Sequence, residues 1–466
     1  MYLNRIEIEN VRAIRKLVLD FEKDGGTRRW TVLLGENGCG KSTVLKAIGL
    51  VLAGSDALAE LLVDVDEWIH NDADVAKIRA EISTAKGDKR KLSLEIHRGD
   101  RRDAIIRRNQ VGLEPLDAAV GKADRNYFIA GYGAFRRPPD LEYSSQKRSA
   151  RLNRAENVST LFSAAADLMS IEQWAMELDY RRGPKGRRII AEALRLLLPG
   201  MSFKRIDKNA RRIMMYTQDG EVPLRNLSEG YQAMAAWAGD ILYRMTEIFD
   251  DWSKPLSARG VLLIDEMDLH LHPVWKRNFV DFLDRAFPNL QIVATTHSPL
   301  SIQQCAEGEL FVVKRDAKGL PTLVPFKGDP SKLRLSELFL SPLIGLDTLD
   351  SPRVAALRDE ARVIELGRGK RTKMDIKRLD QIAQELEGTT PLPVAEAPSL
   401  ASDMALRRSL QQLLPSEEVA RLKLRAAPAP ARTPDSTASK SVANRAAAKK
   451  PAAKVAGVRA SAKKAK

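Results

Sequence analysis

The sequence is poor in cysteine and in histidine. Its 466 residues include two cysteines, Cys39 and Cys305, and five histidines. Two cysteines do not suggest a disulfide framework, so we expect a reducing, cytoplasmic location. No apolar run approaches the roughly 20 residues that span a bilayer, and no membrane partner is expected. The first residues, MYLNRIEIEN, lack the apolar segment of a secretion signal, and none is expected.

Positive charge is unevenly distributed along the chain. The net charge is +15, and residues 421–466 hold 13 Lys and Arg with one acid, so the first 420 residues carry only +3. The stretch 425–466 contains no aromatic residue and is rich in Ala, Lys and Pro. Such a composition cannot bury enough apolar surface to fold, and we expect a disordered basic tail. The tail is a candidate for contacts with nucleic-acid phosphates, and a solubilising role is the alternative.

Hydrophobic periodicity predicts a mixture of strands and helices. The all-apolar runs GVLLID (260–265) and LQIVATTH (290–297) are typical of central parallel strands that are buried on both faces, and residues 272–287 fit the crossover helix between them. Further strands are expected at 2–11, 14–21, 76–83, 90–98, 102–108, 125–135, 203–207 and 212–217. Helices are expected at 161–180, 187–198, 227–245, 361–367, 376–388 and 404–424.

A glycine-rich loop lies between an apolar strand and a helix. The segment GENGCGKS, Gly35–Ser42, fits the pattern G-x-x-x-x-G-K-[ST]. Its glycines let backbone N–H groups point inward around a triphosphate, and the helix that begins near Lys41 adds the positive end of its dipole. We expect Lys41 to reach the β and γ phosphates and Ser42 to bind Mg²⁺. The predicted nucleotide-binding residues are Gly35, Glu36, Asn37, Gly38, Cys39, Gly40, Lys41, Ser42 and Thr43.

A second motif, VLLIDEMDLHLHP, covers Val261 to Pro273 and ends in acids and histidines. A buried strand would deliver Asp265 to the Mg²⁺ shell, and Glu266 could orient the attacking water. Three interpretations remain open for the rest of the motif. Asp268, His270 and His272 could hold zinc, the histidines could cap the turn before Pro273, or the segment could lie at a dimer interface.

Four segments in order, GENGCGKST, LRNLSEGYQ, VLLIDEMDLHLHP and ATTHSP, resemble the ABC-type ATPase head shared by SMC, RecF and OLD-like proteins. The resemblance covers about residues 1–340. It implies an α/β P-loop NTPase fold, with a mixed sheet, an inserted helical lobe and a C-terminal helical extension. It also implies ATP and Mg²⁺ as cofactors and a homodimer, with higher oligomers open.

The same resemblance suggests roles for further residues. Ser228 and Gly230 match the signature that caps the γ-phosphate held by the opposite subunit, and His297 matches the switch histidine that senses this phosphate. Glu266 and His297 are therefore the predicted catalytic residues. Arg12 matches a basic position near the nucleotide. The sequence departs from the family in one element, because GYGAFRR, Gly131–Arg137, occupies the place of the glutamine loop and contains no glutamine.

The resemblance also divides the chain. The head is expected over 1–345, with one lobe at about 1–130 and 255–345 and a helical signature lobe at about 131–254. Residues 346–424 would form a helical accessory region that binds a partner, followed by the basic tail at 425–466. The short distance between the phosphate loop and the signature excludes a long coiled-coil arm. No acidic pattern of a Toprim nuclease follows His297, so no nuclease site is expected in this chain.

The compact head resembles most the PtuA-like ATPase subunits of Septu-type antiphage defence, which work with a separate HNH nuclease. A DNA-associated sensor or motor is therefore expected. The alternatives are a RecF-like repair ATPase, a non-catalytic ATP-bound scaffold for an effector, and a transporter ATPase. Basic clusters are candidates for DNA contact, and a solvated charged face is the other interpretation. They comprise Lys86, Lys89, Arg90, Lys91, Arg98, Arg101, Arg102, Arg107, Arg108, Arg136, Arg137, Lys147, Arg148, Arg151 and Arg154.

Overall fold

The computed structural model describes residues 1–84, 87–135, 154–166, 168–198, 200–218, 220–249, 255–269, 271, 273–341, 343–366 and 372–386. All of them belong to one compact unit, Met1–Leu414. The expected helix at 404–424 and the basic tail at 425–466 lie outside the described residues.

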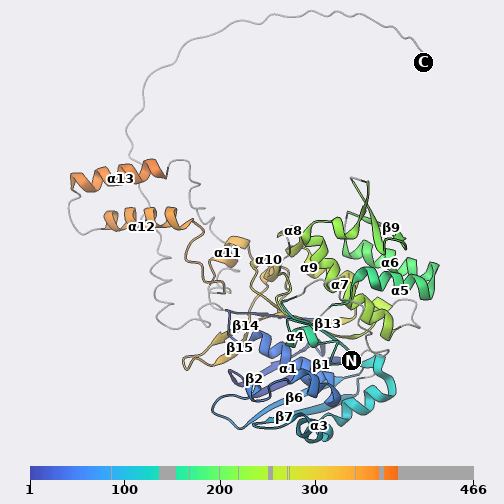
Figure 1. The fold of residues 1–466 in the computed structure, drawn as a ribbon. Coiled ribbons are helices and arrows are strands. Elements are labelled where there is room, and N and C mark those ends of the chain that lie inside the picture. Colours follow the sequence, from blue (N-terminus) through green and yellow to red (C-terminus); the bar gives the residue numbers. More distant parts are fainter. Residues whose placement is uncertain are drawn as a thin grey trace, which may run out of the picture. The chain divides into compact units, whose positions relative to one another are not determined.

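A six-stranded sheet forms the centre of the molecule (Figure 1). Its spatial order is β15 (Pro321–Pro325), β14 (Leu310–Arg315), β5 (Trp30–Leu34), β13 (Leu290–Thr296), β12 (Gly260–Ile264) and β8 (Phe128–Tyr132). Neighbouring strands pair in parallel from β14 to β8, and β15 pairs antiparallel at one edge. The two all-apolar runs are therefore adjacent parallel strands, as the sequence predicts.

Each central strand contributes to two different hydrophobic cores. In β12, Leu262 and Ile264 belong to one core, whereas Val261 and Leu263 belong to the other. Successive side chains of a strand point to opposite faces, so a sheet covered on both sides needs apolar residues at every position. This requirement explains why the sequence of β12 shows no polar alternation.

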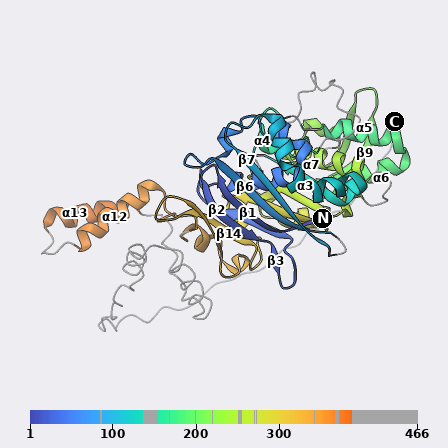
Figure 2. The same ribbon diagram turned by 90° about the horizontal axis from the view of Figure 1, so that it is seen from below.

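On one face of this sheet lies α1 (Lys41–Ala53), which is covered in turn by a second, antiparallel sheet (Figure 2). The second sheet has the order β2 (Ile14–Asp20), β1 (Tyr2–Val11), β6 (Val75–Ser83) and β7 (Lys89–His97). Ten of the thirteen residues of α1 are buried, because the helix contacts strands of both sheets. The smaller elements of this region are β3 (Glu22–Lys23), β4 (Gly26–Thr27) and α2 (Leu58–Leu61).

The sequence prediction was wrong at residues 102–108, where a strand was expected. These residues begin α3 (Arg102–Ala123), which runs along β7. Asn109 on this helix closes the free edge of β7, since its Oδ1 accepts from the backbone N of Glu95 at 2.7 Å and its Nδ2 donates to the Glu95 carbonyl at 2.9 Å. A β-carbon on Gly112 would lie 2.1 Å from the carbonyl oxygen of Ser93, so glycine permits this close packing. The helix protects a strand edge that would otherwise be open to pairing.

The other face of the six-stranded sheet carries the helical lobe (Figure 1). The buried indoles of Trp174 and Trp237 lie in its core. The lobe consists of α5 (Ile171–Arg182), α6 (Pro184–Leu197), α7 (Glu229–Ile248) and a sheet of β9 (Ser202–Asp207), β10 (Arg212–Thr217) and β11 (Gly220–Pro223). The short helix α4 (Ser159–Phe162) instead packs on the α1 side of the six-stranded sheet. The expected single crossover helix is two helices, α8 (Pro273–Lys276) and α9 (Phe279–Ala286).

A buried ionic network joins α7 to the six-stranded sheet. Asp240 accepts hydrogen bonds from the hydroxyl of Tyr132 at 2.9 Å, from Nε and Nη2 of Arg244 at 2.5 and 3.1 Å, and from the backbone N of Met169 at 2.8 Å. Arg244 Nη1 donates to Asn157 Oδ1 at 2.7 Å. Burial and the charge of Asp240 raise the pKa of Tyr132 well above its usual value. Paired charges of this kind are costly to disrupt, because each partner would be left buried and uncompensated.

The remaining described helices complete the fold. They are α10 (Pro299–Ile302), α11 (Leu335–Phe339), α12 (Pro352–Leu366) and α13 (Lys373–Glu385), and the single-turn 3₁₀ helices are η1 (Ser55–Ala57), η2 (Asp66–Trp68), η3 (Asp124–Tyr127), η4 (Leu224–Asn226), η5 (Pro255–Ser257) and η6 (Pro330–Lys332). Within the described ranges, no helix has the length and hydropathy to cross a bilayer. The α/β fold class with a mixed sheet and a helical lobe is confirmed.

Candidate nucleotide site

The glycine-rich loop connects β5 to α1. Gly40 lies immediately before α1 with φ of 102°, and Gly38 has φ of 75°, a region that residues with a β-carbon rarely adopt. A β-carbon on Gly35 would lie 2.2 Å from the carbonyl oxygen of Val313 and 2.8 Å from Sγ of Cys39. These contacts explain the glycines of the motif and give Cys39 a packing role in the loop.

The loop faces solvent through Glu36 and Asn37, whereas Lys41 is 5% exposed. Nζ of Lys41 donates to the carbonyl oxygens of Gly35 at 2.8 Å and Glu36 at 2.9 Å, so the ammonium group lies across the start of the loop. The Nη2 atom of Arg315 on β14 donates to the Gly38 carbonyl at 2.9 Å, and this hydrogen bond helps to hold the loop in place. No sequence motif marks Arg315.

Ser42 and Thr43 occupy the first turn of α1 and are half-buried. Their hydroxyl groups form no hydrogen bond with any residue that the structure describes. A free hydroxyl at a helix N-terminus, beside a buried ammonium group, fits a phosphate-bound Mg²⁺. The residues present here are therefore compatible with the ATP and Mg²⁺ that the sequence predicts.

Asp265 and Glu266 follow β12 directly, and the adjacent strand β13 fixes their positions. Thr295 Oγ1 donates to Oδ1 of Asp265 at 2.7 Å and accepts from the backbone N of Glu266 at 2.7 Å. The Asp265 backbone N donates to the Tyr132 carbonyl on β8 at 2.8 Å. One threonine hydroxyl thus contacts both predicted acids, which no sequence pattern indicated.

Glu266 has the left-handed φ of 48°, which is uncommon for a residue with a β-carbon and often marks a functional position. Oε1 of Glu266 lies 3.2 Å from Nε2 of His297, the residue that follows β13 by one position. That Nε2 atom is buried and, although close to Glu266, has no aligned hydrogen-bond partner among the described residues. The structure thus brings together the two predicted catalytic residues.

Electrostatics keep the His297 ring neutral at pH 7. Burial lowers the pKa of His297 and the charge of Lys41 lowers it further, while Asp268 and Asp265 act in the opposite direction. A neutral imidazole can donate one hydrogen bond and accept another. His297 therefore lies within the field of both the phosphate loop and the acidic motif.

Two cations extend the positive region beside Asp265. Arg12 has a φ of 50° in the turn between β1 and β2, and its guanidinium carbon lies 4.5 Å from the ring centre of Trp68. Burial lowers the pKa of Lys46 on α1, as does the charge of Arg12, while Asp265 opposes this shift. Lys46 was missed because it lies beyond the loop motif, one helical turn after Ser42.

Asp268 is buried and committed to protein partners. Its Oδ1 accepts from Thr296 Oγ1 at 2.6 Å, and its Oδ2 lies 3.3 Å from Nζ of Lys276. The described residues contain no group of three or more His, Cys, Asp or Glu side chains that could hold a metal ion. His270 and His272 lie outside the described residues, so the zinc, turn-capping and interface interpretations of these histidines stay predictions.

The predicted signature residues lie at the start of α7. Ser228 is its N-cap, is exposed and makes no side-chain capping bond, and Gly230 lies in the first turn. Within the described chain, no hydrogen bond joins either residue to the phosphate loop. A serine hydroxyl at the N-terminus of a 20-residue helix is a good partner for an anion supplied from outside the subunit.

The segment in place of the glutamine loop begins on β8. Thr160 Oγ1 donates to the Gly131 carbonyl at 2.8 Å and lies 3.4 Å from the backbone N of Gly133, which holds this end of the segment against α4. Phe135 is exposed, and Arg136 and Arg137 lie outside the described residues. No described residue of the segment supplies a carboxamide.

Several cations proposed for DNA contact are engaged by other groups of the chain. Lys89 pairs with Glu22 at 2.8 Å and Glu81 at 3.1 Å, and Arg108 pairs with Asp100 at 3.0 Å. Arg90, Arg98 and Arg154 donate to backbone carbonyls. Lys91, Arg101, Arg102 and Arg107 are exposed. The other cations of these clusters, Lys86, Arg136, Arg137, Lys147, Arg148 and Arg151, lie outside the described residues.

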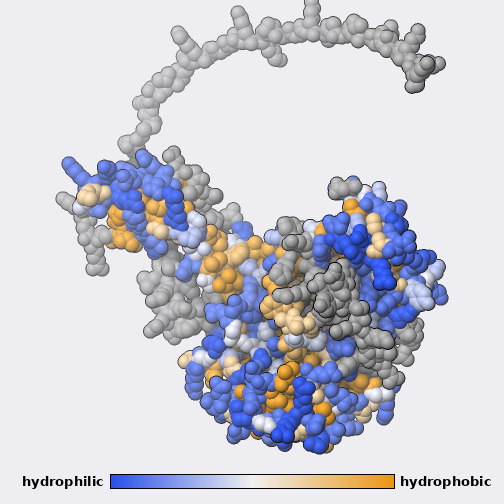
Figure 3. All heavy atoms as spheres, viewed as in Figure 1, coloured by the Kyte–Doolittle hydropathy of each residue, from blue (hydrophilic) through white to orange (hydrophobic). Residues whose placement is uncertain are grey.

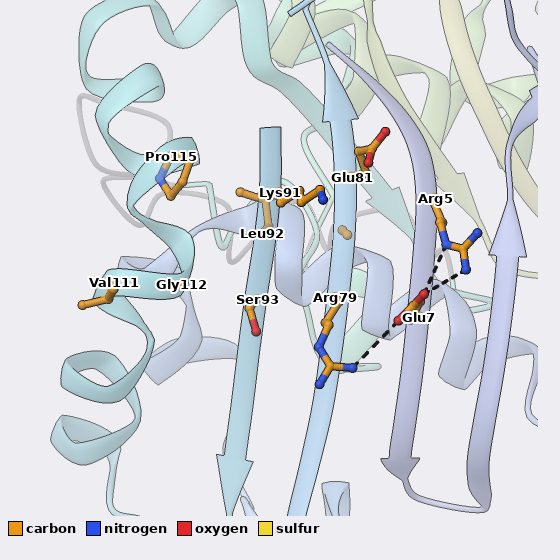
Figure 4. A pocket seen from close by; sticks show the side chains of 11 residues that line it. Arg5, Glu7, Arg79, Glu81, Lys91, Leu92, Ser93, Val111, Gly112 and Pro115 are labelled. Carbon is orange, nitrogen blue, oxygen red and sulfur yellow. Dashed lines mark hydrogen bonds and ion pairs between the residues drawn. The ribbon is translucent and has the colours of Figure 1, made fainter. Parts of the chain in front are cut away.

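A groove of about 450 Å³ lies on the outer face of the antiparallel sheet beside α3 (Figure 4). Glu7 lies between two arginines there, with Oε1 2.9 Å from Arg5 Nη2 and Oε2 3.8 Å from Arg79 Nη1. Lys91 and Glu81 also line the groove. Because its charges are mixed and paired across strands, the groove has the character of a solvated ionic face.

The chain is similar in sequence to a known protein family and to several known proteins. The family described as "AAA domain, putative AbiEii toxin, Type IV TA system" matches residues 30–303. The Septu protein PtuA of Bacillus mycoides (strain KBAB4) is 29% identical over 314 residues, which are 67% of this chain and 40% of that protein. The Retron Vc95 probable ATPase of Vibrio cholerae serotype O1 biovar El Tor is 30% identical over 164 residues, which are 34% of this chain and 32% of that protein.

The matched part thus spans less than half the length of each of these two relatives. Among solved structures, the Smc head bound to the C-winged helix domain of ScpA is 18% identical, with a TM-score of 0.44 over 70% of this chain and 98% of that chain. The family match extends from β5 through the phosphate loop and the acidic motif to α10, which is more than half of the sequence. The chain therefore belongs to this AAA-domain ATPase family.

Proposed function

We propose that this chain binds ATP with Mg²⁺ and hydrolyses it. The observation that carries the proposal is the gathering of Asp265, Glu266 and His297 at the ends of β12 and β13, within the electrostatic field of Lys41. Bound Mg²⁺ would neutralise charge on the phosphate oxygens, with Ser42 and Asp265 as its protein ligands. No other described part of the chain combines a phosphate-binding loop with acids at adjacent strand ends.

Glu266 is the residue that would orient the attacking water and accept its proton. Its backbone is held in a left-handed conformation by the hydrogen bond to Thr295, so its carboxylate has a defined starting position. His297, kept neutral by burial and by Lys41, would contact the terminal phosphate through the buried Nε2 atom. Arg12 and Lys46 would add positive charge beside the phosphates.

We further propose that two copies close around ATP. The exposed Ser228 hydroxyl and Gly230 start α7 without any bond to the phosphate loop of their own subunit in the described chain, which suits contact with nucleotide held by a second copy. The names of two relatives, a Septu protein and a retron ATPase, support a role in antiphage defence. Within such a role we propose a DNA-associated sensor or motor. A separate HNH nuclease would then perform cleavage, since we propose no nuclease site in this chain.

Two substitutions test the ATPase proposal. Lys41→Ala should lose nucleotide binding, measured by fluorescence of a labelled ATP analogue, because the ammonium group and its hold on the loop are removed.

Glu266→Gln should bind ATP normally and release phosphate at least about a hundredfold more slowly, since general-base assistance is worth about 10²–10⁴ in rate. Normal phosphate release by Glu266→Gln would contradict the role of this residue, and unchanged affinity in Lys41→Ala would contradict the site itself.

A second candidate is a non-catalytic ATP-bound scaffold for an effector protein. The observation in its favour is the apolar surface of the α12–α13 pair, where Val363, Leu366, Met374 and Ile376 are all more than half exposed. Apolar residues in such a position are typical of a protein-binding face. Absence of phosphate release with and without DNA, despite normal ATP binding, would favour the scaffold. A RecF-like repair ATPase would instead hydrolyse ATP on DNA without a nuclease partner.

A further inference from the structure

The helical lobe concentrates positive charge away from the residues of the nucleotide site. Residues 180–212 include eleven Lys and Arg and two acids, Glu192 and Asp207, a net charge of +9. The first 420 residues together carry only +3, so the rest of that part is net negative. The charge of residues 180–212 is therefore a local property of this lobe. Figure 3 shows hydrophilic residues over the part of the helical lobe near β9 and α6.

Asp179 brings the two basic turns of this lobe together. Its carboxylate is buried near the end of α5 and lies 3.3 Å from Nη1 of Arg187 on α6. The same carboxylate lies 3.1 Å from Nζ of Lys208 in the turn between β9 and β10. The α5–α6 turn and the β9–β10 turn are thus neighbours, and their cations form one surface.

Asp207 in this region is already engaged by its own turn. Oδ1 of Asp207 accepts from the backbone N of Asn209 at 3.1 Å and of Ala210 at 3.0 Å, which closes the β9–β10 turn. In contrast, Lys185, Arg188 and Arg211 are exposed and form no ion pair with any described residue. Three cations without partners in this small region favour a polyanion as the binding partner.

Two exposed aromatic rings accompany these cations. Tyr180, which directly follows Asp179, is 90% exposed, and Tyr216 on β10 is 56% exposed. Nζ of Lys204 lies 5.9 Å from the ring centre of Tyr216. Exposed tyrosine rings offer flat faces on which unpaired bases can stack. A duplex hides its base faces, and an acidic protein needs no aromatic platform.

We propose that this surface, defined by Tyr180, Lys185, Arg188, Lys204, Arg211 and Tyr216 and named here the lobe surface, binds single-stranded nucleic acid. The cations contact backbone phosphates, and the tyrosines stack on bases. The proposal specifies how the proposed DNA-associated ATPase contacts DNA, and it rests on that proposed function. It places the contact on the helical lobe, apart from the hairpin clusters that the sequence suggested.

The test uses the full chain and a short labelled single-stranded DNA of mixed sequence, with fluorescence anisotropy as the readout. Tyr180→Leu/Tyr216→Leu should raise Kd about tenfold or more, because stacking on each base is worth about one power of ten in affinity. The basic tail at 425–466 is a candidate for DNA contact but contains no aromatic residue, so this loss reports on the lobe surface alone. Affinity for duplex DNA should change little in the same variant.

A charge variant and a matched control complete the test. Lys185→Gln/Arg188→Gln/Arg211→Gln should reduce the slope of log Kd against log salt by about 2, at about 0.7 for each phosphate contact on a single strand. The control, Arg101→Gln/Arg102→Gln/Arg107→Gln just before and within the start of α3, removes the same charge and should leave the slope unchanged. Equal effects in the two triple variants, or unchanged DNA binding in the tyrosine variant, would overturn the proposal.

A polyglutamate probe separates nucleic acid from an acidic protein partner. The proposal would also be overturned if polyglutamate bound as tightly as DNA and if the tyrosine substitutions weakened both interactions equally. Basal phosphate release should be the same in all these variants, because none of the changed residues lies in the nucleotide site. Lys41→Ala should retain DNA binding, so failure of the ATPase proposal and failure of the lobe surface are distinguishable.

Discussion

At the scale of single residues, Thr295 links the parts of the candidate site. Its hydroxyl donates to Asp265 and accepts from the backbone of Glu266, although it comes thirty positions later in the sequence than Asp265. The acids and His297 could be selected from sequence because their motifs carry distinctive chemistry. Thr295 could not, since a hydroxyl in a strand has no signature of its own, and only the pairing of β12 with β13 brings it beside Asp265.

Thr295→Val should impair the use of Mg²⁺ more than the binding of ATP. The change keeps the shape of the side chain and removes the hydrogen bonds that orient Asp265 and Glu266, and such outer contacts are typically worth about 10–100-fold in metal affinity or activity. We expect the Mg²⁺ concentration for half-maximal phosphate release to rise by about tenfold. Thr295→Ser keeps the hydroxyl and should behave as the unaltered protein. Identical Mg²⁺ curves for the valine and serine variants would contradict this role.

At the scale of elements, the sequence succeeds where one pattern occupies a whole strand or helix. β12, β13 and α7 were predicted because their apolar residues suffice to identify them. The start of α3 was misread because residues 102–108, taken alone, lack a clear period. Its helical spacing is visible only over a longer window, in which Ile105, Asn109, Leu113 and Leu116 are buried. The basic stretch 180–212 was missed for a related reason, since its net charge of +9 is cancelled in the total for the first 420 residues.

Arg244→Met should destabilise the helical lobe by about 3 kcal/mol, because Asp240 would remain buried with its charge uncompensated. Trp174 and Trp237 lie in this core, so their fluorescence during urea unfolding is a direct measure. The double variant Arg244→Met/Asp240→Leu removes both charges and should recover part of the lost stability. The explanation fails if the single variant unfolds at the original urea concentration, or if the double variant is no more stable than the single one.

At the scale of the whole molecule, each proposed ATP site combines the phosphate loop of one subunit with the signature of the other. ATP hydrolysis would therefore be a property of the dimer. The phosphate loop and the signature of one subunit would serve two different nucleotides, because an isologous dimer places each signature against the opposite loop. The sequence supplies both parts, but no intramolecular contact can show how they combine. This part of the proposal depends on Ser228 at the start of α7 and on Lys41 at the start of α1.

Mixing two inactive variants should therefore restore activity. Lys41→Ala and Ser228→Arg each spoil both sites of their own homodimer, whereas a mixed dimer retains one site with an intact loop and an intact signature. An equimolar mixture should reach up to about a quarter of the original rate of phosphate release, since half of the dimers are mixed and each has one working site. Activity of the mixture no higher than that of either variant alone would argue for a site contained in a single subunit.

The division of each central strand between two cores has a consequence for how this protein can diverge. Val261 and Leu262 are consecutive in the chain, yet the first packs on the α1 side of the sheet and the second packs on the side of the helical lobe. Substitutions at alternate positions of β12 therefore alter one side and spare the other. Descendants of this sequence can remodel the helical lobe step by step while the packing behind the phosphate loop stays constant.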